Sequence, residues 1–338
     1  MYILRNLDKT EYKKLIEEFG EKEYRIKQIE YAIYNKSVSE ISEIKGLSKD
    51  FIAKLDKVAK VSDTKILNKQ ISKDGTIKYL LGFSDGLAVE MVLMRFDNRA
   101  NLTACISTQI GCKMGCSFCF TAKQGFKRNL KWFEMIDQIL TIQADTGLKI
   151  TNVVFMGQGE PLDNWDEVYK AIEVLNEKLE IGIRRITIST SGLAKDIKKL
   201  YENDLLPTLA ISLHAPNNDI RNEIMPINKR YNMEELKKAL IDFNKVTGKR
   251  VTIEYIMLDE INCEPQHAKE LCNYLKDIKC NINLIPYNSG ECGIYKRPSQ
   301  KKIQIFKLLL EKSGKKVTQR LERGSDIQAA CGQLTGKN

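Results

Sequence analysis

The segment IGCKMGCSFCF, residues 110–120, places three cysteines close together in a C-x3-C-x2-C pattern: Cys112, Cys116 and Cys119. Glycines at positions 111 and 115 ease the bend of so short a loop. Three thiolates on one loop suit three corners of a cubane [4Fe–4S] cluster and leave one iron open to a bidentate small molecule. A structural zinc site is the alternative, but zinc usually takes four ligands from two C-x2-4-C pairs, and the sequence has no second pair. We therefore expect these cysteines to be the ligands of an iron–sulfur cluster.

Around this loop, short strand-like runs alternate with helical stretches. The runs that we expect to form strands cover residues 102–107, 150–156, 185–190, 208–213, 251–257 and 282–287. Their spacing of roughly 30–45 residues is typical of βα units with right-handed crossovers, and hence of a parallel sheet. Six such units are too few for a closed eight-stranded barrel, so the sequence predicts an α/β fold with an open, partial (βα)6 barrel. Ligands of such folds bind at the carboxyl ends of the strands, where this chain has polar and glycine-rich segments.

The N-terminal part of the chain differs from the rest. Residues 1–60 carry helical patterning that begins at a capping box at Asp8. Residues 61–100 contain β-rich runs separated by Asp-Gly turns, which predicts a small antiparallel meander. We therefore divide the chain into a helical, RNA-binding-like module (1–60), a meander or linker (61–100) and a catalytic barrel with a C-terminal cysteine segment (101–338).

The composition is that of an ordinary globular protein: 338 residues, of which 43% are hydrophobic and 29% charged. No run of about 18 apolar residues is present, so we expect no transmembrane helix. The N-terminal stretch has no apolar segment of signal-peptide length. Nine cysteines in a chain without such a signal favour metal or redox chemistry over structural disulfides. We therefore expect a cytoplasmic protein.

The net charge of +10 is unevenly distributed. Residues 296–338 contain 11 Lys or Arg but 3 Asp or Glu, and residues 120–131 add four positive charges and no acid. Residues 1–60 are close to neutral, with 13 basic and 11 acidic side chains. Such concentration indicates a polyanionic partner such as a nucleic acid, and a solvated lysine-rich surface is the alternative.

The cysteine loop resembles that of the radical S-adenosylmethionine (SAM) superfamily, in which the open iron of the cluster chelates SAM. Further segments resemble one family of this superfamily, in order along nearly the whole chain. They are ACISTQIGCKMGCSFCFTAKQGFKRNL (104–130), NVVFMGQGEPL (152–162), RRITISTSG (184–192), AISLHAPN (210–217), INLIPYN (282–288) and GSDIQAACGQL (324–334). That family is the RlmN-type radical SAM methyltransferases, which act on carbon 2 of adenine in ribosomal and transfer RNA.

The resemblance implies a radical SAM barrel, a [4Fe–4S] cluster and two SAM molecules per turnover. By position, the residues that would contact SAM are Gly159, Glu160, Ser189, Ser212, Leu213, His214 and Asn288. The implied partners are large-subunit ribosomal RNA, transfer RNA and an electron donor such as flavodoxin or ferredoxin. We expect the protein to be a monomer that does not bind membranes.

The resemblance also implies a chemistry, because carbon 2 of adenine is electron-poor and cannot attack a sulfonium methyl group directly. A first SAM would methylate Cys331 by ordinary displacement. A second SAM would be cleaved reductively to a 5′-deoxyadenosyl radical, which takes a hydrogen from the S-methyl group so that a methylene radical adds to the ring. Glu90 would then remove a proton from the adduct. Cys105 would release the product by attacking the sulfur of Cys331, which leaves a disulfide.

Other functions remain open at this stage. A Cfr-type enzyme, which methylates carbon 8 of the same ribosomal adenosine and confers antibiotic resistance, shares the cluster and both catalytic cysteines. A non-catalytic iron–sulfur or zinc RNA-binding protein is an alternative from another class. A glycyl-radical activase would leave Cys331 and the basic charge unexplained. The remaining cysteines have no pairing pattern, and we expect no role for Cys263, Cys272, Cys280 and Cys292.

Overall fold

The computed structural model describes residues 1–96, 99–288, 294–329 and 332–334. Its helices are α1 (Lys9–Glu18), α2 (Tyr24–Glu30), α3 (Lys49–Val58), α4 (Phe120–Lys123), α5 (Trp132–Thr146), α6 (Trp165–Glu177), α7 (Asn218–Ile224), α8 (Met233–Thr247), α9 (Pro265–Tyr274) and α10 (Gln300–Lys312). No helix among the described residues is long and apolar enough to cross a membrane.

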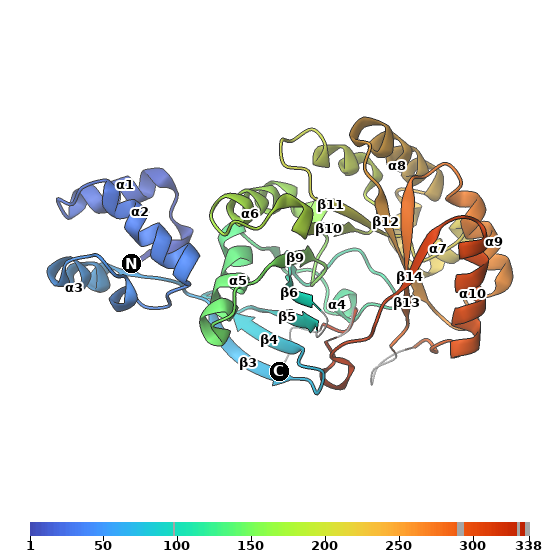
Figure 1. Ribbon diagram of the computed structural model, residues 1–338, viewed down its shortest axis with the longest axis horizontal. Coiled ribbons are helices and arrows are strands. Elements are labelled where there is room, and N and C mark those ends of the chain that lie inside the picture. Colours follow the sequence, from blue (N-terminus) through green and yellow to red (C-terminus); the bar gives the residue numbers. More distant parts are fainter. Residues whose placement is uncertain (97–98, 289–293, 330–331, 335–338) are drawn as a thin grey trace.

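The N-terminal region is helical, as predicted, and lies beside the main body of the molecule (Figure 1). The capping box is present: Oδ1 of Asp8 accepts hydrogen bonds from the backbone N–H groups of Thr10 and Glu11, and the Glu11 side chain accepts one from the Asp8 N–H. A buried ion pair of 2.8 Å between Arg5 and Asp137 joins this region to α5.

One sheet of ten strands forms the centre of the main body, with the order β14-β13-β12-β11-β10-β9-β6-β5-β4-β3. Its strands are β3 (Lys65–Ile71), β4 (Ile77–Gly82), β5 (Ala88–Phe96), β6 (Arg99–Cys105), β9 (Asn152–Phe155), β10 (Ile186–Thr190), β11 (Thr208–Ser212), β12 (Val251–Met257), β13 (Cys280–Pro286) and β14 (Lys316–Gln319). The six parallel strands predicted from the sequence are present, and β14 adds one more parallel strand beside β13. Two further short sheets pair β1 (Tyr2–Ile3) with β2 (Ala59–Lys60) and β7 (Gln109–Ile110) with β8 (Arg128–Asn129).

The antiparallel meander is part of the barrel sheet. Strand β6 pairs antiparallel with β5 on one side and parallel with β9 on the other. The meander β3–β6 therefore extends the barrel wall (Figure 1). Helices α5, α6, α8, α9 and α10 lie outside the curved sheet, whereas the short α4 lies within its curve.

Alternation along the strands decides which side chains face the inside of the curve. In β13, Cys280, Ile282, Leu284 and Pro286 are buried, and the residues between them are half-buried. In β10, Ile186 and Ile188 are buried, and Ser189 is half-buried. Because successive strand residues point to opposite faces, polar residues such as Ser189 and Asn283 line the inside of the barrel.

Candidate active site

Two cavities share a wall inside the curve of the sheet. The inner cavity, of about 150 Å³, is lined by the three loop cysteines and by residues at the ends of β9, β10 and β11. The outer cavity, of about 590 Å³, is lined by residues of β5, β6 and β13 and by the chain after β14. The residues that line both are Cys119, Thr121, Met156, Gly157, Glu254, Ile256, Ile285, Arg320 and Gly332. The predicted site at the carboxyl ends of the strands is therefore a two-part cavity.

The cysteine loop, residues 111–119, is held by backbone contacts at both sides. Strands β7 and β8 pair around the segment that contains it. Gly111 has φ +73°, and a Cβ there would lie 1.7 Å from the carbonyl oxygen of Gly125, so that only glycine fits. Ser117 donates its backbone N–H to the carbonyl of Ile224 at 3.0 Å, which docks the loop on α7.

The three thiols suit a multi-iron cluster better than a single ion. Burial raises the pKa of Cys112 to about 12 and raises the pKa of Cys116 well above its ordinary value. Such thiols stay protonated until a cationic centre stabilises their thiolates. Among the described residues, the one set of three ligand atoms mutually within 4.8 Å lies elsewhere. The three sulfur atoms of the loop therefore do not all lie within 4.8 Å of one another, as they would if all three were bonded to one zinc ion at about 2.3 Å. This wider spacing fits an iron–sulfur cluster.

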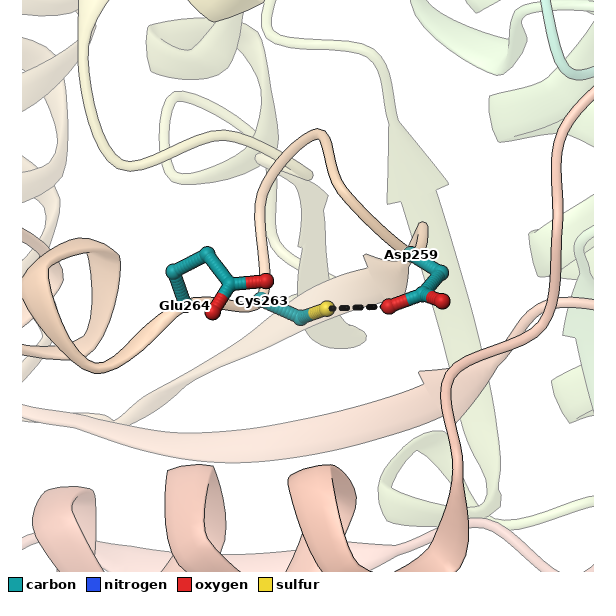
Figure 2. A group of neighbouring side chains, drawn as sticks. All are labelled: Asp259, Cys263 and Glu264. Carbon is teal, nitrogen blue, oxygen red and sulfur yellow. Dashed lines mark hydrogen bonds between the residues drawn. The ribbon is translucent and has the colours of Figure 1, made fainter.

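The other candidate metal-binding group is Asp259, Cys263 and Glu264. Figure 2 shows the Cys263 sulfur pointing toward the Asp259 carboxylate, which lies 4.0 Å away. The ammonium group of Lys302 already lies 2.7 Å from Asp259 Oδ1 and 2.8 Å from Glu264 Oε1. This lysine supplies the cation, and the group is an ion-pair cluster at the start of α9.

The turn after β9 fits closely against the strand β6 and its continuation. A Cβ at Gly157 would lie 2.7 Å from the backbone of Ile106. Glu160 follows this turn with 2% of its surface exposed. Its Oε2 accepts the N–H of Ser191 at 2.7 Å, and its Oε1 accepts that of Leu162 at 3.1 Å. Burial raises the pKa of Glu160. A buried carboxylate that lines the inner cavity is a suitable partner for an ammonium group.

Three predicted SAM contacts lie together in the inner cavity. Ser189 Oγ and Ser212 Oγ are 3.5 Å apart across β10 and β11, and His214 follows β11. Nδ1 of His214 accepts the N–H of Ile256 at 3.0 Å, so the ring proton lies on Nε2. Burial, and then the nearby charge of Arg221, lower the pKa of His214 to about 3. The imidazole is therefore a neutral hydrogen-bond donor.

The other two predicted contacts differ from these. The Leu213 side chain is fully buried in the core and lines neither cavity. Its backbone carbonyl accepts a hydrogen bond from Arg221. Asn288 lines the outer cavity, and within the described part of the chain its buried Nδ2 has no hydrogen-bond partner. Such an orphaned donor fits a ligand with an acceptor atom.

Cys105 and the C-terminal segment meet in the outer cavity. Cys105, at the end of β6, packs in a small apolar cluster with Val92 and Leu334, and Ala329 packs against that cluster. The backbone N–H of Phe120 donates to the Gly332 carbonyl at 2.8 Å. Cys331, the predicted methyl carrier, lies outside the described residues, as does Cys292. Ala329 and Leu334, which lie on either side of position 331 in the sequence, are therefore both close to Cys105.

Glu90 is buried on β5, with 2% of its surface exposed. Lys78 Nζ lies 3.0 Å from its Oε1. Because side chains alternate along a strand, Glu90 shares a face with Val92 and Met94, both of which line the outer cavity. Glu90 itself does not line either cavity.

Sequence reasoning missed Glu254, an acidic residue in the middle of the otherwise apolar strand β12. It lines both cavities, and its Oε2 accepts a hydrogen bond of 2.8 Å from Asn283 Nδ2. Burial raises its pKa. The only signal in the sequence is the carboxylate in VTIEYIM, which would be costly to bury without a function or a partner.

The fold and this site together define a radical SAM enzyme. The family model described as the radical SAM superfamily matches residues 106–272, and the N-terminal domain model of ribosomal RNA large subunit methyltransferases matches residues 3–61.

A probable dual-specificity RNA methyltransferase RlmN of Desulforamulus reducens is 44% identical over 98% of this chain and 95% of its own length. The dual-specificity RNA methyltransferase RlmN of Campylobacter jejuni is 46% identical over 95% of each chain. The crystal structure of a radical SAM methyltransferase from Sphaerobacter thermophilus superimposes with a TM-score of 0.93, at 36% identity and with full coverage of both chains. The chain belongs to the RlmN family of radical SAM methyltransferases.

Proposed function

We propose that this protein methylates carbon 2 of adenosine in large-subunit ribosomal RNA, at the peptidyl transferase centre, and in transfer RNA. The observation that carries the proposal is the meeting of Cys105 with Ala329 and Leu334, which flank Cys331, in a cavity that adjoins the cysteine loop. The names of the relatives, which describe dual-specificity RNA methyltransferases, support the choice of substrates.

The inner cavity has the groups that a SAM molecule needs. Glu160 is placed to accept hydrogen bonds from the amino group, and Gly159 gives that turn its close approach to the wall. Ser189, Ser212 and the Nε2–H of His214 offer neutral hydrogen bonds to the rest of the molecule. Asn288 would contact its part nearest the outer cavity. Two SAM molecules would use this site in one turnover.

The chemistry needs a carbon radical because carbon 2 has no nucleophilic electron pair. Cys112, Cys116 and Cys119 would hold the cluster, which would supply the electron for reductive cleavage of SAM to a radical able to remove a hydrogen from an S-methyl group. Cys331, as thiolate, takes the methyl group from the first SAM and holds the carbon that becomes bonded to carbon 2.

Product release would then use two groups of the barrel wall. Glu90 takes the proton that leaves carbon 2. The unpaired electron of the adduct would pass to the oxidised cluster. The thiolate of Cys105 then attacks the sulfur of Cys331, so a disulfide forms and the bond between that sulfur and the transferred carbon breaks. The carbon keeps the electron pair of that bond and takes up a proton, which completes the methyl group. Cys105 lies in the apolar cluster with Leu334, three residues after Cys331 in the sequence.

RNA would reach the outer cavity at its basic edge. Arg320 and Arg323 line this cavity, at the end of β14. In the stretch 120–131, Arg128 forms ion pairs with Asp85 and Glu134. This arginine is therefore less available to phosphates than its sequence position suggests. Such substrates would place the enzyme in the cytoplasm, and we propose a monomer served by flavodoxin or ferredoxin.

Product analysis tests the proposal. The protein is reconstituted anaerobically with iron and sulfide and incubated with SAM, reductant and a large-subunit RNA fragment, and the digested RNA is examined by mass spectrometry. We expect 2-methyladenosine. 8-Methyladenosine would instead indicate a Cfr-type enzyme, and bound iron or zinc with neither SAM cleavage nor methylation would indicate a non-catalytic RNA-binding protein.

A further inference from the structure

Arg221, on α7, is a completely buried side chain without a carboxylate partner among the described residues. Arg5, the other arginine that is buried among the described side chains, forms an ion pair of 2.8 Å with Asp137. An arginine buried without an opposite charge is strongly unfavourable. Burial lowers the pKa of Arg221 to about 10, so the guanidinium remains charged near neutral pH.

Neutral acceptors hold the Arg221 guanidinium. Nη2 donates to the Ser191 carbonyl at 2.6 Å, and Nε donates to the Leu213 carbonyl at 3.2 Å. Nη1 donates to Asn228 Oδ1 at 2.9 Å. Ser191 and Leu213 follow directly after β10 and β11. The Arg221 side chain is therefore fixed at the carboxyl ends of these strands, next to the inner cavity. These hydrogen bonds satisfy its donors but leave its charge uncompensated.

The cysteine loop lies on the same helix. Ser117 donates from both its backbone N–H and its Oγ to the carbonyl of Ile224, three residues after Arg221. The Arg221 charge interacts with Cys116, where it opposes the effect of burial on the thiol pKa. Arg221 also donates to the carbonyl of Ser191, the residue whose N–H donates to Glu160. The guanidinium is thus connected to the cysteine loop through α7 and to the carboxylate of the inner cavity through Ser191.

We infer that Arg221 is the buried counter-charge of the iron–sulfur cluster and favours its reduced form. A cluster bound by three thiolates carries net negative charge, which increases by one when it accepts an electron. Cluster potentials depend on such charge and on nearby hydrogen bonds. A fixed positive charge behind Cys116 stabilises the reduced form more than the oxidised form. This inference rests on the cluster binding of the proposed function, but not on the identity of the methylated carbon.

Two substitutions at the same position separate charge from hydrogen bonding. Arg221→Gln removes the charge and keeps a donor, whereas Arg221→Lys keeps the charge and loses the planar fork. The wild type and both variants are reconstituted anaerobically, their iron is counted, and the midpoint potential of the cluster is measured by dithionite titration with electron paramagnetic resonance.

We expect Arg221→Gln to shift the reduction equilibrium at least tenfold toward the oxidised form, which is 59 mV for one electron. Arg221→Lys should stay within about threefold of the wild type. Equal shifts of the midpoint potential in both variants, or no shift in Arg221→Gln, would overturn the inference. Arg221 would then have only a structural role, holding the ends of β10 and β11 together. A wild type that binds no iron would contradict the proposed function itself.

A second variant, Asn228→Asp, keeps Arg221 in place. It tests whether the Arg221 charge affects the cluster potential even if Arg221→Gln does not fold. Asn228→Asp is isosteric and places a carboxylate 2.9 Å from Nη1, where Oδ1 of the asparagine lies now. The paired guanidinium should stabilise the reduced cluster less, so the potential should fall as in Arg221→Gln. An unchanged or higher potential in Asn228→Asp would contradict the inference.

Discussion

Thr121 Oγ1 donates a hydrogen bond of 2.8 Å to the backbone carbonyl of Leu334. Thr121 is buried in α4, directly after the cysteine loop, and Leu334 packs against Cys105 in the outer cavity. This bond therefore fixes the C-terminal segment relative to the cysteine loop and to β6. If position 331 carries the methyl group, its distance from a SAM molecule in the inner cavity depends on this attachment.

Thr121→Val should slow methyl transfer by roughly fivefold, because it removes a hydrogen bond worth about 1 kcal/mol and leaves the Leu334 carbonyl unpaired. Thr121→Ser keeps the hydroxyl and is the matched control. Single-turnover methylation of the protein by labelled SAM, at equal iron content, measures the effect. Equal rates in the valine and serine variants would show that this bond does not position the segment.

Substituting the two cysteines that we propose to be catalytic should have different consequences. Cys331→Ala should abolish both protein methylation and RNA methylation, since the carbon has no carrier. Cys105→Ala should still form the bond to RNA but fail to break it, so that a covalent protein–RNA adduct accumulates. Gel electrophoresis before and after nuclease digestion detects the adduct. Cys272 lies on α9 and lines neither cavity, so Cys272→Ala is the control. Normal product release by Cys105→Ala would exclude its proposed role.

Glu90→Gln tests proton removal but also breaks a buried ion pair. Loss of the carboxylate leaves the Lys78 ammonium uncompensated, which should lower the free energy of unfolding by about 3–5 kcal/mol. The double variant Lys78→Met, Glu90→Gln removes both charges and should recover most of that stability. It should still accumulate the RNA adduct, because no base remains to take the proton. Recovery of release together with stability would show that Glu90 is structural.

The strands and the cysteine loop could be predicted from local pattern, whereas the buried charges could not. Runs such as VTIEYIM carry β-branched and apolar residues over the length of a strand, and the loop is defined by spacing alone. Strand β14, KVTQ, has one apolar residue and gives no such signal. Its place beside β13 is decided by tertiary packing, yet it delivers Arg320 to both cavities.

The burial of Arg221 is the feature of the structure that the sequence pattern indicates least. Its helix, NDIRNEI, reads as a polar surface helix, and an arginine there would be expected in solvent. Only the fold reveals that α7 packs beneath the cysteine loop with the arginine on its inner side. Glu254 could not be assigned from local sequence for the same reason. Its hydrogen-bond partner Asn283 lies on the neighbouring strand β13, and only the register of β12 and β13 places the two residues side by side.

His214→Asn tests the neutral state of the imidazole through the stability of the chain. The pKa of His214 is about 3 in the folded protein and about 6.5 in the unfolded chain, so the unfolded state binds more protons between these values. The stabilising contribution is therefore complete above about pH 6.5 and is lost as the pH falls. Between pH 6.5 and about pH 5 the free energy of unfolding should fall by about 2 kcal/mol, at 1.36 kcal/mol per pH unit.

Asparagine suits this position because it tolerates the φ of +59° and its Oδ1 replaces Nδ1 as the acceptor for Ile256. Its side chain does not titrate, so this part of the pH dependence should be missing in the variant. Urea unfolding of both proteins at several pH values, without iron, measures the difference between their slopes. Parallel slopes would mean that His214 has the same pKa in the folded and the unfolded chain, so that the fold does not lower this pKa and does not hold the imidazole neutral as the pH falls.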